Sequence, residues 1–242
     1  MTRTALITGA SGGIGSAIAR RLAGDGMSVI VGYHSNEAAA QAVVDGLTGA
    51  THRTMQLSVL DGGSLSRMAG QITALDVLVN CAGVTAPVAH DDLDGLGDEL
   101  IDQIFATNWR GPFATIRAVS HLLEASDDAV IVNISSVAGV TGQGSNVAYC
   151  ASKAALDSMT RSLARALGPS IRVMSVSPGW VRGEYSDRMP AEALAVQENA
   201  TPLRRLAVPE DVAAAVSAVV HDLPFSTGTA IAVDGGRPLG AA

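Results

Sequence analysis

Tyr149 and Lys153 lie four residues apart in the segment YCASKAA, and Lys153 is the only lysine in a chain whose 16 basic residues are otherwise arginine. Residues four apart share one face of a helix, so the ammonium group would lie near the phenol. A nearby positive charge lowers the pKa of a phenol from about 10 toward neutrality, where the phenol can exchange protons with a substrate. Lysine is a compact charge and arginine a broad, rigid fork, so a cramped site would require the lysine. We therefore expect proton-transfer chemistry here, the alternative being a surface lysine kept by chance.

A second motif, ALITGASGGIGSAIARRLA, joins an apolar run, a glycine-rich turn and an amphipathic helical pattern at residues 5–23. Gly9 can supply the tight turn, and Gly15 allows the helix to pack closely on the strand. The free N–H groups of residues 11–15 would then form an anion site suited to a pyrophosphate. An ordinary strand-to-helix turn is the plain alternative, but a strand and a helix flank these glycines as dinucleotide binding requires.

Further motifs in the same order make the chain resemble the short-chain dehydrogenase/reductase family over nearly its whole length. The family's TGxxxGIG corresponds to residues 8–15, and its NNAG corresponds to NCAG at 80–83, where Cys81 replaces the second asparagine. SPGWV at 177–181 and VDGG at 233–236 match the later signatures of the family. The resemblance assigns the catalytic positions to Asn108, Ser136, Tyr149 and Lys153.

The resemblance also implies a role for each of these side chains. Ser136 would hydrogen-bond the substrate carbonyl, Tyr149 would donate the proton, and the hydride would come from the nicotinamide. Ser135 competes with Ser136, but successive residues of a strand face opposite sides, so both should not face the site. The spacing of the family selects Ser136 and leaves Ser135 a structural role.

Asn108 falls in a long helical pattern that continues to Pro112. Because proline has no N–H, the carbonyl of Asn108 loses its helical donor and can bind water. The resemblance places the corresponding asparagine in a proton relay through water and the lysine. Two interpretations stay open, a helix kinked near Asn108 and a helix that ends near Gly111 and restarts.

The cofactor implied by the resemblance is a nicotinamide dinucleotide. Enzymes that use NAD usually carry Asp or Glu after the second strand, where it binds ribose hydroxyls and repels a 2′-phosphate. The segment YHSN at 33–36 has neither, so we expect NADP(H) rather than NAD(H), although Gly12 stands where many NADP-dependent relatives have arginine. Ser58 stands where relatives commonly have aspartate near the adenine. The expected cofactor-binding residues are Gly9, Ser11, Gly12, Gly13, Ile14, Gly15, Tyr33, His34, Ser35, Ser58, Val59, Asn80, Ala82, Gly83, Tyr149, Lys153, Pro178, Gly179 and Val181.

The elements that must position these residues alternate along the chain. Ala/Leu-rich stretches with helical spacing separate six apolar runs, namely ALIT, SVIVGY, DVLVN, AVIVNIS, IRVMSVS and AIAVD. Strands that are apolar on both faces indicate a parallel sheet covered by helices on each side. We therefore predict an α/β, Rossmann-type, doubly wound sheet that forms a single domain over residues 1–242. The irregular segment 182–209 is interpreted as a flap over the site, the alternative being a plain surface excursion.

Composition excludes several classes of partner. The net charge of −7 and the absence of a basic run argue against nucleic acid and acidic membranes. Cys81 and Cys150 lack CxxC spacing, the start MTRTALITGA has no leader pattern, and no apolar run is long enough to span a bilayer, so a cytoplasmic protein is expected. The five histidines show no close ligand spacing, which predicts no metal site.

Within the family, the chain is most similar to 3-oxoacyl-acyl-carrier-protein reductases. This similarity implies NADPH-dependent reduction of a ketone, such as a 3-oxoacyl thioester on a carrier protein or CoA, by a homotetramer. Asp127 and Asp128 stand where carrier reductases often have basic residues, so other ketones and a sugar or alcohol dehydrogenase activity stay open. Four arginines of the segment 182–209 could bind a carrier or CoA phosphate or simply face solvent: Arg182, Arg188, Arg204 and Arg205. A non-catalytic dinucleotide-sensing regulator is the alternative from another class, and the four intact catalytic positions argue against it.

Overall fold

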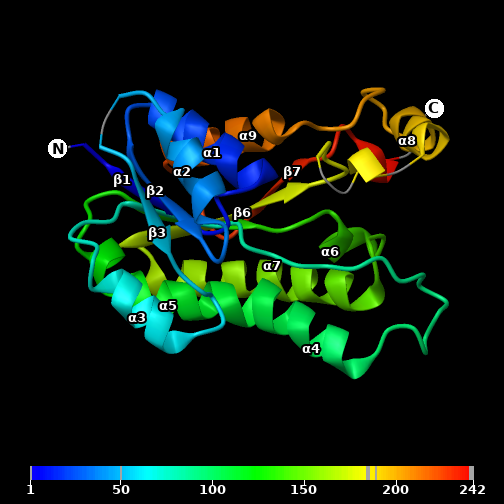
Figure 1. Cartoon of the computed structure of the whole chain (residues 1–242), viewed down its shortest axis with the longest axis horizontal. Coiled ribbons are helices and arrows are strands. Elements are labelled where there is room, and N and C mark those ends of the chain that lie inside the picture. The colour runs from blue at the N-terminus through cyan, green and yellow to red at the C-terminus, as the bar shows by residue number, and fades with distance from the viewer. Residues whose placement is uncertain (1, 50, 184–185, 189, 240–242) are drawn as a thin grey trace.

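A computed structural model describes residues 2–49, 51–183, 186–188 and 190–239 of the chain (Figure 1). In this part of the chain, seven parallel strands form one sheet in the order β3-β2-β1-β4-β5-β6-β7. The strands are β1 (Thr4–Ile7), β2 (Ser28–Tyr33), β3 (Arg53–Gln56), β4 (Val77–Asn80), β5 (Ala129–Ile134), β6 (Ile171–Pro178) and β7 (Ala230–Val233). The central strands β4 and β5 are buried at every residue, as expected for strands covered on both faces.

Helices cover both faces of the sheet (Figure 1). One layer consists of α1 (Gly13–Gly24), α2 (Glu37–Asp45) and α9 (Pro209–His221), and the other of α3 (Gly62–Ala69), α4 (Asp98–Phe105), α5 (Gly111–Glu124) and α7 (Val147–Leu167). Two hydrophobic clusters follow this division, because alternate residues of each central strand point to opposite helix layers. Val130 and Val132 of β5 belong to one cluster, for example, and Ile131 belongs to the other.

The expected α/β Rossmann-type doubly wound sheet is confirmed, and the six apolar runs form β1, β2, β4, β5, β6 and β7. Strand β3 was not predicted, and its residues Arg53, Thr54, Met55 and Gln56 include only one buried side chain. An edge strand of this kind carries no continuous apolar signal. None of the helices formed by the described residues has the length and apolarity needed to cross a membrane.

The strand order places a ligand site at one end of the sheet. The chain runs from β1 outward to β2 and β3, then returns to β4 on the other side of β1. Loops that leave β1 and β4 therefore diverge to opposite faces, and such a reversal opens a crevice at the carboxyl ends of the strands.

The helix around Asn108 is continuous. A π-helical turn, η1 (Ala106–Arg110), connects α4 directly to α5, and Gly111 N–H bonds the carbonyl of Ala106. The interpretation of a helix that ends near Gly111 and restarts is therefore wrong, and the chain stays helical from α4 through α5. The π turn adds one residue to the helix ahead of Pro112, and such turns occur frequently at functional sites.

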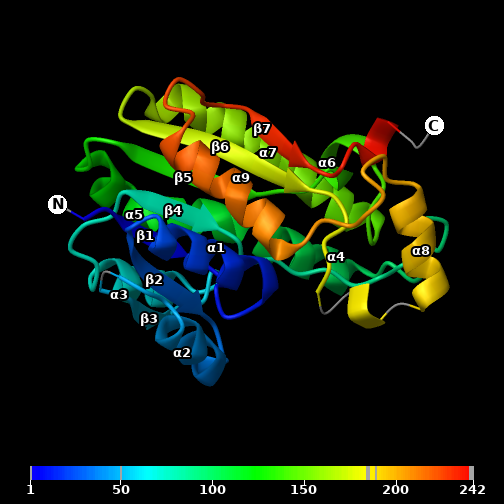
Figure 2. The ribbon, with the colours of Figure 1, turned by 90° about the horizontal axis from the view of Figure 1, so that it is seen from above.

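The segment 182–209 lies beyond the carboxyl ends of β6 and β7 (Figure 2). It contains a short 3-10 turn, η2 (Ser186–Arg188), and α8 (Ala191–Asn199), while residues 184, 185 and 189 fall outside the described ranges. A bridge between Val181 and Ala207 joins the two ends of the segment. Of its arginines, Arg182 pairs with Glu198 and Arg205 with Asp211, which leaves these two less available to a phosphate.

Candidate active site

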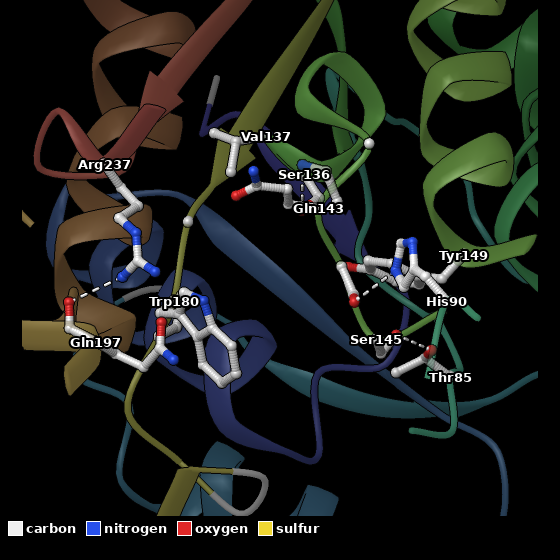
Figure 3. A pocket seen from close by; sticks show the side chains of 15 residues that line it. Thr85, His90, Ser136, Val137, Gln143, Ser145, Tyr149, Trp180, Gln197 and Arg237 are labelled. Carbon is white, nitrogen blue, oxygen red and sulfur yellow. Dashed lines mark hydrogen bonds between the residues drawn. The ribbon is translucent and has the colours of Figure 1, made fainter. Parts of the chain in front are cut away.

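A cavity of about 550 Å³ opens at the carboxyl ends of the strands (Figure 3). Loops that follow four different strands contribute to it, because Thr85 comes after β4, Ser136 after β5, Trp180 after β6 and Arg237 after β7. Its lining residues are Thr85, His90, Ser136, Val137, Ala138, Gly142, Gln143, Gly144, Ser145, Tyr149, Gly179, Trp180, Val181, Gln197 and Arg237. Ser136 and Tyr149, which come from separate predicted motifs, thus line one cavity.

Ser136 is held at the wall of this cavity by the backbone around it. Its Oγ accepts a hydrogen bond from the N–H of Ala138 at 3.1 Å and donates to the carbonyl of Pro178 at 3.4 Å. The hydroxyl of Ser135 donates instead to the carbonyl of Lys153 at 3.3 Å, on the buried side of the strand end. The two serines face different surroundings, as expected. Of the two, Ser136 lines the cavity and Ser135 does not.

Tyr149 lies in the first turn of α7, where Asn146 caps the helix. Asn146 Oδ1 accepts from the N–H of Tyr149 at 2.7 Å and the Asn146 amide donates to the carbonyl of Ala86 at 2.7 Å, so the cap also anchors the loop after β4. Burial raises the pKa of the Tyr149 phenol, and a hydrogen bond with Ser136 acts in the opposite direction. The expectation that Lys153 lowers this pKa is therefore wrong for the protein without a cofactor, because burial outweighs the favourable contact and that contact comes from Ser136.

Lys153 lies one turn farther along α7 and is only 6% exposed. Its Nζ donates to the carbonyl of Ile134 at 2.8 Å and lies 5.6 Å from the centre of the Tyr149 ring. Burial lowers the pKa of Lys153 from 10.5 to about 8, while Cys81 and Asp157 act to raise it. The sole lysine is therefore a buried group of the site rather than a surface residue.

Asn108 connects the π turn to the loop after β4. Its Oδ1 accepts from the N–H of Val84 at 2.8 Å, and its Nδ2 donates to the Val84 carbonyl at 3.0 Å and to Ser152 Oγ at 3.2 Å. The side chain is therefore engaged in positioning the loop after β4 against the π turn and α7.

Cys81, at the position where the family has asparagine, follows β4 close to Lys153. Burial raises the pKa of its thiol to about 11, against an opposing effect of Lys153. The thiol is thus neutral near pH 7 and does not compete with Lys153 for a proton. Thr8 Oγ1 accepts from the N–H groups of Cys81 and Ala82 at 3.0 and 3.1 Å, which ties the NCAG segment to the glycine-rich turn.

The glycine-rich turn has the shape that a dinucleotide needs. Gly9 adopts a φ of +67°, and a Cβ there would lie 3.0 Å from Cα of Ala82. A Cβ on Gly15 would lie 2.5 Å from the Gly9 carbonyl oxygen, whereas a Cβ on Gly12 or Gly13 would meet no described atom within 4 Å apart from neighbouring residues of the turn and helix. The N-terminus of α1 at Gly12 has no side-chain cap, so its N–H groups face this open space. These residues fit a bound pyrophosphate.

Other residues expected at the cofactor fall into three groups. Gly179 and Val181 line the cavity beside Ser136 and Tyr149, and the carbonyl of Pro178 accepts from Ser136. At the other end, Tyr33 ends β2, and the carbonyl of His34 accepts from Gln56 on the neighbouring strand β3. Three expected residues are engaged with the protein itself, because Ser58 N–H bonds Ser64, Val59 packs against Gly111, and the Asn80 side chain donates to Asn133 in the interior.

Several cavity residues were not identified by the sequence analysis, namely Thr85, His90, Gln143, Trp180, Gln197 and Arg237. Trp180 and Arg237 had a usable signal, since each sits within or directly after a family motif at a strand end. Gln197 had none, because α8 reaches the cavity only through the path of the segment 182–209.

Comparisons with known proteins agree with this geometry. A family model described as enoyl-(acyl carrier protein) reductase matches residues 9–237. The 3-oxoacyl-(acyl-carrier-protein) reductase FabG of Staphylococcus aureus is 33% identical over 98% of both chains. Cis-4-hydroxycyclohexanecarboxylate dehydrogenase of Sinomonas cyclohexanicum is 36% identical over 97% of this chain and 96% of that protein. A crystal structure of a short-chain dehydrogenase/reductase from Burkholderia xenovorans matches with a TM-score of 0.90 at 33% identity and covers 99% of both chains.

These matches extend over almost the whole length of each protein, and they include the strands and loops that build the cavity. With Ser136, Tyr149 and Lys153 brought together as the motifs predict, the chain belongs to the short-chain dehydrogenase/reductase family and is an oxidoreductase that acts on carbonyl and alcohol groups.

Proposed function

We propose that this enzyme uses NADPH to reduce the ketone of a 3-oxoacyl thioester to a secondary alcohol, with Tyr149 as the proton donor. The observation that carries the proposal is the meeting of Ser136 and Tyr149 in one cavity, with Lys153 buried behind the phenol. The thioester is suggested by relatives such as the staphylococcal reductase, whose name states a 3-oxoacyl carrier substrate.

A bound NADPH would supply the hydride that the carbonyl carbon needs. Ser136 holds the carbonyl oxygen by donating its hydroxyl, and Tyr149 transfers its phenolic proton to that oxygen, so that the ketone becomes a secondary alcohol. The raised pKa of Tyr149 keeps the phenol protonated at neutral pH, which suits a proton donor. Lys153, with its Nζ at 5.6 Å from the centre of the ring, would bond the ribose and so hold the cofactor beside Tyr149.

The preference for NADPH is supported by the residues at the end of β2. Tyr33, His34 and Ser35 include no carboxylate that would repel a 2′-phosphate. The nearest acidic residue is Glu37, in the first turn of α2, and its charge and hydrogen bond act on the Tyr33 hydroxyl, whose pKa is raised by burial and by this carboxylate.

We also propose a homotetramer in which the helices that carry Asn108 and Tyr149 lie at the interfaces between subunits. Trp109 and Phe113 stack at 6.1 Å on the outer face of the first of these helices, and each is 37% exposed. A pair of aromatic rings on a surface is typical of an interface between subunits. Light scattering measures the mass directly, and a monomer would contradict this part of the proposal.

The function is tested with NADPH and NADH on a panel of 3-oxoacyl thioesters, diketones and simple ketones, using wild type and Tyr149→Phe. We expect higher kcat/KM with NADPH, and a loss of at least about 100-fold in kcat for Tyr149→Phe with unchanged NADPH affinity, because only the proton donor is removed. Fluorescence titration of NADPH serves as the control for binding. Near-normal turnover of Tyr149→Phe, or no turnover of any carbonyl compound by wild type, would contradict the proposal.

A further inference from the structure

Arg237 is a charged residue of the cavity that the proposed reaction does not use. Its side chain points into the cavity from the turn after β7, on the side opposite Tyr149 and His90 (Figure 3). Trp180 and the amide of Gln197 lie beside it, and Val137 completes the wall between Arg237 and Ser136. The carbonyl-binding groups and the guanidinium are thus two separate polar regions of one cavity.

The position of Arg237 is fixed by the turn that carries it. Gly235 and Gly236 have φ values of +62° and +81°, and Gly236 N–H bonds Asp234 Oδ1 at 2.8 Å. A Cβ on Gly236 would lie 3.1 Å from the ring of Pro202, so this turn packs tightly on the segment 182–209. Arg237 Nη1 then donates to the carbonyl of Gln197 at 2.9 Å. The side chain is therefore held in place before any ligand arrives.

Among the described residues, no carboxylate balances the charge of Arg237. No Asp or Glu occurs among the 15 lining residues, and within the described ranges Arg237 forms no ion pair. The nearby Arg182 and Arg205, in contrast, are paired with carboxylates. A guanidinium has five N–H donors, and the bond to Gln197 uses only one of them. The remaining donors form a fork that matches a carboxylate.

Gln197 brings a second polar side chain to this edge of the cavity. Its Oε1 is buried and has no hydrogen-bond partner among the described residues, although its amide lies next to Arg237 (Figure 3). A buried acceptor without a donor is destabilising, and a carboxylate has no hydrogen to donate to it. Either water meets Oε1, or the amide turns so that its Nε2–H faces a carboxylate held by Arg237.

We propose that Arg237 is an anion subsite and that the enzyme also reduces compact oxo acids, whose free carboxylate binds Arg237 while the ketone lies at Ser136 and Tyr149. The inference rests on the proposed ketone reduction and extends it to a second substrate class. A CoA or carrier phosphate is separated from the reacting carbonyl by the long pantetheine arm, so it would lie outside a cavity of about 550 Å³. A carboxylate a few carbons from the ketone fits, with Trp180 and Val137 against the carbon chain.

The test compares linear oxo acids with their methyl esters, from 3-oxobutanoate to 6-oxoheptanoate, which move the carboxylate stepwise away from the ketone. For the acid of best length we expect kcat/KM at least about tenfold above that of its ester, mainly through KM, because the ester has lost its charge. In Arg237→Met this preference should disappear, and Arg237→Lys should keep part of it, since a point charge replaces the fork. Arg204→Met, which removes an exposed arginine outside the cavity, is the matched control and should retain the preference.

Calorimetry of the same acid binding to the enzyme with NADP⁺ gives a readout that does not depend on turnover. Tighter binding of the acid than of the ester by wild type, and equal binding by Arg237→Met, would support the subsite even if the ketones proved to be poor substrates. Esters and acids that are reduced and bound equally would overturn the subsite while leaving the ketone reduction in place. A changed oligomer mass of Arg237→Met, with unchanged acid preference, would assign Arg237 to a subunit contact and also overturn it.

Discussion

Replacing Lys153 by methionine should make the protein more stable at pH 7 while removing its activity. The ammonium is 6% exposed, and burial lowers its pKa from 10.5 to about 8, so the fold disfavours the charge it holds. At about 1.4 kcal/mol for each unit of pKa, the difference between 10.5 and about 8 corresponds to about 3 kcal/mol. The lost hydrogen bond to the Ile134 carbonyl offsets about 1 to 3 kcal/mol of this, which leaves a gain of about 1 kcal/mol.

The pH dependence is the sharper measurement, and its sign follows from the direction of the pKa change. Between about pH 8 and 10.5 the unfolded chain keeps the Lys153 proton and the folded protein has lost it. The free energy of unfolding of wild type therefore rises with pH across this window, by about 2.5 kcal/mol from pH 7 to pH 10. Below pH 8 both states are protonated and the full penalty is present. Lys153→Met has no such group, so the rise should be absent from its profile.

Urea unfolding of both proteins at pH 7, 8, 9 and 10, followed by tryptophan fluorescence, checks this expectation. Subtracting the two profiles removes the titration of all other groups that behave alike in both proteins. Asp157→Asn is a second arm, because Asp157 raises the Lys153 pKa and its removal should move the lower edge of the window below pH 8. Parallel profiles for wild type and Lys153→Met would refute the reasoning, since the buried ammonium would then carry no penalty.

Two matched pairs test the rest of the site. Ser136→Ala should lower kcat by about 100-fold or more in an assay with NADPH and a reducible ketone. Ser135→Ala loses only a bond to the Lys153 carbonyl, so its kcat should stay within a few-fold of wild type in the same assay. Equal losses in kcat would mean that the roles of the two serines are misassigned. Gly9→Ala should reduce the stability measured by thermal unfolding by about 1 kcal/mol or more, because a φ of +67° and the contact with Ala82 both oppose a Cβ. Gly12→Ala should unfold like wild type, because Gly12 has a φ of −131° and open space for a Cβ. If both glycine variants unfolded alike, the tight-turn argument would fail.

The parts of the fold that could be predicted from sequence are those with a continuous signal. Strands of the sheet centre, such as β4 and β5, are buried on both faces and read as unbroken apolar runs. The edge strand β3 has partners on one side only and mixed side chains, so its four residues gave no such signal. The catalytic positions could be predicted because motif spacing fixes them along one helix or one strand end.

The cavity wall could not be predicted in the same way. Gln197 and Arg237 are 40 residues apart and meet through a hydrogen bond between α8 and the turn after β7, a relation that no local pattern records. The direction in which the Tyr149 pKa is shifted could not be predicted for a related reason. Its spacing from Lys153 is local, but the burial that dominates the pKa comes from the packing of other loops over α7. Local spacing identifies which groups meet, and tertiary packing decides their charge.

Gly83 shows how the motif and the packing are connected. A Cβ at this position would lie 3.3 Å from Oδ1 of Asn108 and 3.9 Å from Nζ of Lys153. The NCAG loop, the π turn and α7 therefore converge on a point where a side chain would press on both polar groups. Asn108 Oδ1 is already bonded to the Val84 N–H beside this point, so it has little freedom to withdraw. The glycine of the motif is thus explained by the space that Asn108 and Lys153 require, and the extra residue of the π turn helps to bring Asn108 to that place.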